Sequence, residues 1–310
     1  MPSETPAFLD PRLTERRNPR SHDLDSRSSL ELVDLINSED ASIATAVAKV
    51  GPEIARSIDL IEGAFRAGGR LLYVGAGTSG RLGVLDAAEC VPTFSAPPGM
   101  VIGIIAGGLP ALVRPIEGAE DDVNDGIAQM VGHQVGGKDV VVGIAASGTT
   151  PFVRGALGKA QALGARTILL SCADAPVVLR ETCDVCITVL TGPEVLTGST
   201  RMKAGTATKL VLNILSTGAM VRIGKTYGNL MVDLTATNTK LVDRGQRLVM
   251  EVAGVDRTQA LAALEAAGGS VKVAIVMLRR GLPRVEAEKL LAQHQGRLRP
   301  IIGDPPEVVQ

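Results

Sequence analysis

Short runs of consecutive branched apolar residues alternate with longer helical patterns between about residues 50 and 248. Unbroken apolar runs are typical of parallel strands buried on both faces, whereas apolar residues at every third or fourth position indicate helices. The predicted strands are residues 70–75, 101–106, 139–145, 166–171 and 184–190. The predicted helices are residues 52–67, 79–90, 109–130, 151–163 and 199–223. This alternation predicts an α/β fold with a doubly wound, five-stranded parallel sheet.

The two ends of the chain carry different patterns. Residues 1–30 are polar and rich in Arg, Ser and Pro, which on composition alone leaves a disordered tail open, and helical periodicity begins at Ser29. Three short amphipathic helices are predicted over residues 256–299, with breaks at Gly268-Gly269 and at Gly281-Leu282-Pro283. The expected domains are an N-terminal arm and helix (1–47), the sheet domain (48–248), and a C-terminal three-helix bundle with a tail (249–310).

Three predicted strands run into turns that are rich in Gly and in hydroxyl side chains. These turns begin at Gly75, Ala146 and Gly192. Because parallel strands end at the same edge of a sheet, the N–H groups and hydroxyls of the turns can converge on one anion, most often a phosphate. Helix capping is the alternative for any single turn. Two Gly-flanked turns on one sheet favour the phosphate site.

Two motifs resemble cofactor or metal sites but lack a necessary partner. Gly75-x-Gly77-x-x-Gly80 matches the dinucleotide fingerprint, yet residues 95–105 contain no carboxylate to hold a ribose. Cys183-Asp184-Val185-Cys186 has neither a second CxxC nor a nearby His. We therefore expect no nicotinamide cofactor and no metal.

Charge and hydropathy narrow the class of partner. The net charge is −1, and the chain has no Trp, two Tyr and four Phe. This composition offers no basic surface or aromatic platform for nucleic acid and no attraction to an anionic membrane. No signal-like segment begins the chain, and no apolar run approaches the roughly 18 residues of a membrane span. We expect a cytoplasmic protein.

Three carboxylates near the turns are candidate acids or bases. Glu89 has apolar neighbours on its predicted helix, so we expect it to be partly desolvated and suited to general acid catalysis. Glu120, expected on the helix after the second strand, and Glu194, in the third turn, are the alternatives. A solvated helix face is the ordinary interpretation for such residues.

These motifs resemble the N-acetylmuramic acid 6-phosphate etherases, a family of the sugar isomerase (SIS) domain superfamily that is related to the glucokinase regulatory proteins. The resemblance runs from about residue 10 to the C-terminus and implies that the N-terminal segment is ordered and closes over a site. The matching segments are residues 14–21, 75–83, 86–94, 105–108, 118–122, 146–151 and 192–209. The expected substrate- and phosphate-binding residues are Gly77, Thr78, Ser79, Gly80, Ser147, Gly148, Thr149, Thr150, Glu194, Ser199 and Thr200.

The resemblance implies a carbon–oxygen lyase of cell-wall amino sugar recycling. Such an enzyme would cleave the D-lactyl ether of N-acetylmuramic acid 6-phosphate by elimination and then water addition, giving N-acetylglucosamine 6-phosphate and D-lactate. Glu120 would remove the C2 proton, and Glu89 would protonate the departing lactate oxygen. No cofactor is implied, and a homodimer with shared active sites is expected. A non-catalytic sugar-phosphate-sensing regulator and a SIS-type sugar-phosphate isomerase are the alternatives.

Overall fold

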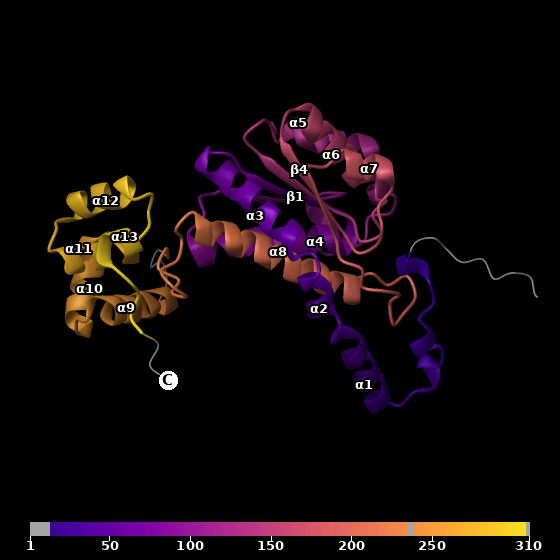
Figure 1. Ribbon diagram of the computed structural model, residues 1–310, viewed down its shortest axis with the longest axis horizontal. Helices are drawn as coiled ribbons and strands as arrows, with labels where there is room; N and C mark the ends of the chain where they lie inside the picture. The colour runs from indigo at the N-terminus through magenta and orange to yellow at the C-terminus, as the bar shows by residue number, and fades with distance from the viewer. Residues whose placement is uncertain (1–12, 235–238, 308–310) are drawn as a thin grey trace, which may run out of the picture. The chain divides into compact units, whose positions relative to one another are not determined.

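The computed structural model describes residues 13–234 and 239–307 (Figure 1). Contacts within the chain define two units, Met1–Ala88 with Gly99–Ser216 and Glu89–Pro98 with Thr217–Gln310. The expected domain limits after residues 47 and 248 stay a prediction.

A five-stranded parallel sheet forms the centre of the first unit. Its strands follow the order β2-β1-β3-β4-β5, which confirms the predicted fold class. The strands are β1 (Leu71–Gly75), β2 (Val101–Ile105), β3 (Val140–Ile144), β4 (Arg166–Ser171) and β5 (Val185–Thr188). Every residue of β1 and β3 is buried, as their continuous apolar runs require. The order reverses between β1 and β3, and ligands of open α/β sheets bind at such a switch point.

Helices cover both faces of this sheet (Figure 1). On one face, side chains such as Phe152 and Leu157 pack against Leu72, Val141 and Leu169 of the strands. The helices of this face are α5 (Val123–Gly132), α6 (Pro151–Ala162) and α7 (Val177–Glu181). The opposite face carries α3 (Gly51–Arg66), α4 (Gly77–Phe94) and α8 (Lys203–Arg222). The sheet is therefore buried between two helical layers.

The segment after β2 is not the single helix predicted over residues 109–130. It forms two short 3-10 helices, η4 (Leu109–Leu112) and η5 (Ala119–Asp121), and then α5. Gly118 has a φ of 72°, a left-handed conformation that ends any helix before it. The Asp122 side chain then accepts a hydrogen bond of 2.9 Å from the backbone N–H of Asp125 and caps α5. The prediction was wrong because turn residues outweigh apolar spacing here, and Glu120 consequently lies in the short 3-10 helix η5.

The N-terminal arm is built from short turns and two helices. Thr14 and Asn18 are buried, so the described residues from 13 onward do not form a disordered tail. Residues 1–12 lie outside the described residues. The elements of the arm are η1 (Leu13–Glu15), η2 (Pro19–Ser21), η3 (Leu24–Ser26), α1 (Ser29–Asp40) and α2 (Ile43–Ala48). A capping box between Ser28 and Glu31 starts α1.

The second unit contains a helical bundle around its own core, which includes Val249, Ile275 and Leu298. Its helices are α9 (Thr239–Ala253), α10 (Arg257–Ala266), α11 (Val271–Arg280), α12 (Arg284–Gln293) and α13 (Arg299–Ile302). The three helices predicted between residues 256 and 299 are α10, α11 and α12, with breaks where expected. No helix in the described parts of the chain has the length and apolar character needed to cross a membrane.

Candidate active site

A cleft of about 380 Å³ lies at the carboxyl edge of the sheet, where β1 and β3 end. It lies at the switch point of the strand order, and both of the first two turns contribute to its walls. The predicted site residues that line it are Gly77, Thr78, Ser79, Glu120, Ser147, Thr149, Thr150 and Thr200. The structure therefore brings together residues from four separate segments of the sequence.

The first turn presents the start of α4 to the cleft. α4 begins at Gly77, two residues after the last residue of β1, so the unpaired N–H groups of its first turn are available to an anion. Gly80 does not line the cleft. A Cβ atom on Gly80 would lie 2.6 Å from the carbonyl oxygen of Gly75, so this glycine allows the helix to approach the strand. Its expected contact with substrate stays a prediction.

The second turn supplies hydroxyl groups. The Oγ atom of Ser147 and the Oγ1 atom of Thr149 lie 3.0 Å apart, and both residues line the cleft. Gly148 is buried with a φ of 74°, which turns the chain between them. α6 begins at Pro151, so its first N–H groups also belong to this edge. Together the two turns can hold a phosphate through hydroxyls, amides and helix dipoles.

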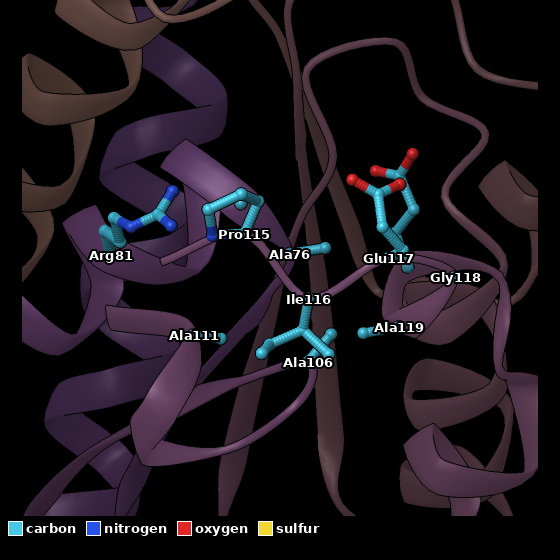
Figure 2. A pocket seen from close by; sticks show the side chains of 11 residues that line it. Ala76, Arg81, Ala106, Ala111, Pro115, Ile116, Glu117, Gly118 and Ala119 are labelled. Atoms are coloured by element: carbon cyan, nitrogen blue, oxygen red, sulfur yellow. The ribbon is translucent and has the colours of Figure 1, made fainter. Parts of the chain in front are cut away.

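Carboxylates form another part of the wall. Glu120 and Asp121, both from η5, line the cleft, and Glu120 is solvent-exposed. Glu120 also borders an adjoining cavity of about 220 Å³, which shares Ala76 and Gly77 with the cleft. Figure 2 shows the side chains that line this smaller cavity. This places a carboxylate at the junction of an anion-binding cleft and a second, smaller pocket.

Glu15 of the N-terminal arm also lines the cleft, and it was not among the site residues predicted from the sequence. The arm is held on the third turn by hydrogen bonds from Asn18 Nδ2 to the Pro193 carbonyl (3.4 Å) and from Ser21 Oγ to the Val195 carbonyl (2.7 Å). These contacts agree with an ordered arm beside the site. Residues 14–21, one of the segments that match the family, were the signal for an ordered arm, but their polar composition did not indicate that they pack against the third turn.

Glu194, the carboxylate of the third turn, was expected to contact the substrate, but it is not among the residues that line the cleft. Glu194 is fully buried, and its two oxygens accept hydrogen bonds of 2.9 Å from the backbone N–H groups of Lys203 and Ala204. Burial raises the pKa of Glu194, and the two N–H donors counteract only part of this effect. The carboxylate therefore caps α8 and does not line the cleft. Contacts of Glu194 and Ser199 with substrate stay predictions.

Glu89 lies apart from the residues that line the cleft. It is exposed in the second half of α4, ten residues after Ser79, or roughly 15 Å along the helix axis. The expected desolvation of Glu89 is therefore wrong for a single chain. Leu85 and Val91, two of its apolar neighbours in sequence, are 53% and 50% exposed, because this part of α4 is not covered by the chain itself.

Asp86, three residues before Glu89, is held by hydrogen bonds within the fold. Its oxygens accept hydrogen bonds from Tyr73 Oη (2.9 Å), Asn213 Nδ2 (2.7 Å) and Ser216 Oγ (3.2 Å). Burial raises the pKa of Asp86, although the three donors oppose the shift. Asp86 thus ties α4 to β1 and α8.

The cysteine pair lies outside the cleft. The interaction with Cys186, together with burial, raises the pKa of Cys183, whereas the hydrogen bond from Cys183 lowers the pKa of Cys186 to about 7. Among the described residues, no three His, Cys, Asp or Glu side chains are grouped to hold a metal ion. The expected independence from metals stays a prediction.

The parallel sheet with hydroxyl-rich turns at its switch point agrees with the sugar isomerase (SIS) domain, the class that a family model matches in this chain. A family model described as the glucokinase regulatory protein N-terminal SIS domain matches residues 53–161. Two solved structures are similar, each with a TM-score of 0.49. One is a putative phosphosugar isomerase involved in capsule formation from Bacteroides fragilis, 20% identical, covering 63% of this chain and 91% of that one. The other is a phosphoheptose isomerase from Francisella tularensis, 17% identical, covering 62% of this chain and 100% of that one.

Similarity to curated relatives extends over nearly the whole chain. The N-acetylmuramic acid 6-phosphate etherase of Edwardsiella ictaluri is 51% identical over 297 residues, which cover 96% of this chain and 98% of the relative. That of Trichormus variabilis is 55% identical over 287 residues, covering 93% of each. The chain belongs to the N-acetylmuramic acid 6-phosphate etherase family.

Proposed function

We propose that this chain cleaves the D-lactyl ether of N-acetylmuramic acid 6-phosphate and releases D-lactate and N-acetylglucosamine 6-phosphate. The reaction is that of a carbon–oxygen lyase in the recycling of cell-wall amino sugars. Identity of 51% to an etherase over 96% of the chain supports this substrate. The observation that carries the proposal is a cleft that combines hydroxyl-rich turns with the carboxylate of Glu120.

The two turns bind the phosphate group of the substrate. Ser79, Ser147 and Thr149 line the same cleft and supply hydroxyls, while α4 and α6 present free N–H groups at their first turns. These contacts fix the sugar at one end. Positioning of this kind lowers the entropic barrier for the reaction at the other end of the sugar.

Glu120 acts as the base in the elimination. Opening of the sugar ring exposes an aldehyde at C1, which acidifies the proton on C2. Glu120 removes this proton, the C2 electron pair forms the C2–C3 double bond, and the C3–O bond to lactate breaks. Glu120 is exposed in the described chain, so its carboxylate is accessible to a bound sugar.

Glu89 acts as the acid that protonates the departing lactate oxygen. It then takes a proton from the water that adds to C3, while C2 regains its proton. Because Glu89 does not line the cleft of its own chain, we propose a homodimer in which Glu89 of the partner subunit completes the site. Exposed Leu85 and Val91 on the same helix support coverage of this surface by another subunit.

The first test is incubation with N-acetylmuramic acid 6-phosphate and an enzymatic assay for D-lactate. Release of D-lactate together with N-acetylglucosamine 6-phosphate supports the proposal. A ketose phosphate without D-lactate would indicate a SIS-type isomerase, and binding without turnover would indicate a sugar-phosphate-sensing regulator. The expected location in the cytoplasm and independence from metals and cofactors stay predictions, and the latter is tested by exhaustive chelation and by assay without added nicotinamide.

The second test asks whether the two carboxylates come from different subunits. Glu89→Gln and Glu120→Gln chains are each expected to be inactive. In a symmetric dimer with shared sites, mixing unfolded chains in equal amounts and refolding them should restore about a quarter of the unaltered activity. The reason is that half of the dimers are mixed, and each has one intact site. No recovery in refolded mixtures that contain mixed dimers would place both residues in one subunit.

A further inference from the structure

The smaller cavity beside the cleft has a chemistry of its own. Ala106, Ala111, Pro115 and Ile116 form apolar parts of its wall, and Arg81 contributes a guanidinium group. Its volume is about 220 Å³, and Glu120 borders both this cavity and the phosphate-binding cleft. Glu120 removes the proton on C2. A substituent on the neighbouring carbon, C3, would therefore lie close to this cavity.

Arg81 retains donors for a ligand. Its Nε atom donates a hydrogen bond of 3.0 Å to the Leu112 carbonyl, which fixes the side chain against η4. Within the described chain, its two terminal nitrogens make no hydrogen bond or ion pair. Arg81 lies across the cavity from Glu117 (Figure 2), so the side of the cavity near Arg81 is the side that favours an anion.

We propose that this cavity binds the lactyl group and that Arg81 binds its carboxylate, an inference that rests on the proposed function. A lactyl group carries one methyl group and one carboxylate. The small apolar side chains suit the methyl group, and the paired terminal nitrogens of an arginine suit a planar carboxylate. Since the sugar product lacks the lactyl group, Arg81 distinguishes substrate from product.

The test compares substrates that differ only at this carboxylate. The probes are N-acetylmuramic acid 6-phosphate, its lactyl primary amide, and N-acetylglucosamine 6-phosphate as an inhibitor. In the unaltered chain, the amide should have a kcat/KM about ten- to a hundredfold lower, because charge-assisted hydrogen bonds are lost. Arg81→Gln should lower kcat/KM for the carboxylate substrate by a similar factor and leave the amide almost unaffected.

Inhibition by N-acetylglucosamine 6-phosphate should have the same constant in Arg81→Gln as in the unaltered chain. Arg154→Gln, which changes an exposed arginine of α6, is the matched control and should alter none of these values. If Arg81 only supports η4 through Leu112, kcat/KM of the variant will fall by the same factor for the carboxylate substrate and for the amide. If Arg81 binds the phosphate, affinity for the inhibitor will fall as well. Either result would overturn the proposal.

If the proposed function is wrong, the unaltered chain will release no D-lactate, and this result is distinct from a failure of the Arg81 proposal. Calorimetric affinities of the same three sugar phosphates would in that case decide the role of Arg81. Preference for the carboxylate over the amide that disappears in Arg81→Gln would support the subsite. An equal preference in both chains would contradict it.

Discussion

Glu39 of α1 and Lys203 at the start of α8 form an ion pair of 2.6 Å in which both side chains are almost fully buried. Arg20 and Asn18 contact the same carboxylate at 2.8 and 3.0 Å. The pair therefore joins the N-terminal arm to the segment that follows the third turn. Because Glu15 belongs to this arm, docking of the arm places an additional carboxylate in the cleft.

Glu39→Gln should destabilise the protein markedly. Removing one partner of a buried pair leaves the other charge uncompensated, which typically costs about 3–5 kcal/mol. Arg166→Gln is the matched control, because the Arg166–Asp184 pair has an arginine that is 62% exposed and such pairs contribute at most about 1 kcal/mol. Urea denaturation measures both variants. Equal effects would contradict the structural role of the Glu39–Lys203 pair.

Acid should remove the stabilisation that Glu39 provides. Burial opposes ionisation, but Lys203, Asn18 and Arg20 outweigh burial and lower the pKa of Glu39 below its ordinary value of 4.5. The ionised carboxylate therefore stabilises the fold above about pH 4.5, and this stabilisation is lost as the pH falls through the lowered value. The difference in unfolding free energy between the unaltered chain and Glu39→Gln should shrink over that range. A constant difference would contradict this assignment.

Glu15→Gln should impair catalysis without affecting stability. Glu15 lines the cleft, and its one described hydrogen bond within the chain is a weak contact of 3.4 Å from Thr14 Oγ1. If the carboxylate accepts hydrogen bonds from the sugar, kcat/KM should fall about ten- to a hundredfold. Glu31→Gln, in the exposed capping box of α1, controls for general effects on the arm. Unchanged turnover with tighter substrate binding would show that Glu15 only repels the phosphate.

The phosphate group should be required for efficient turnover. Ser79 and Ser147 contribute hydroxyls from two different turns, and each charge-assisted hydrogen bond is worth about 1.5–3 kcal/mol. Unphosphorylated N-acetylmuramic acid should therefore be a poor substrate. Ser79→Ala and Ser147→Ala should raise KM for the phosphorylated sugar while changing KM for the unphosphorylated sugar much less. Comparable kcat/KM values for both sugars would contradict the phosphate site.

The parts of this protein that follow local rules could be predicted from its sequence. Continuous apolar runs identified β1 and β3, and the turns after them placed Ser79 and Ser147 at one edge. The segment containing Glu120 was assigned to a helix because apolar spacing concealed the effect of Gly118. Capping by Asp122 was overlooked in the same way.

Long-range contacts could not be predicted in this way. Glu15 reaches the cleft through packing between the arm and residues 193–195, which no local pattern encodes. Glu194 was predicted as an alternative acid or base, although it caps a helix that begins nine residues later. The exposure of Glu89 reflects a surface that the chain alone does not cover. Such relationships depend on the assembled fold, not on local sequence.

In the proposed mechanism, Glu120 removes the C2 proton and Glu89 protonates the lactate oxygen. Glu89→Gln keeps the size of the side chain but cannot donate a carboxylic proton, so lactate release should nearly stop. Proton removal from C2 requires only the other carboxylate and the aldehyde, so it should continue. Glu120→Gln should lose both steps.

The most direct measurement is incubation of both variants with N-acetylmuramic acid 6-phosphate in deuterated water, followed by NMR of the recovered substrate. Glu89→Gln should introduce deuterium at C2 while releasing little D-lactate, and Glu120→Gln should do neither. Exchange by Glu120→Gln but not by Glu89→Gln would reverse the two roles. Full activity in both variants would contradict these roles and assign the chemistry to other residues.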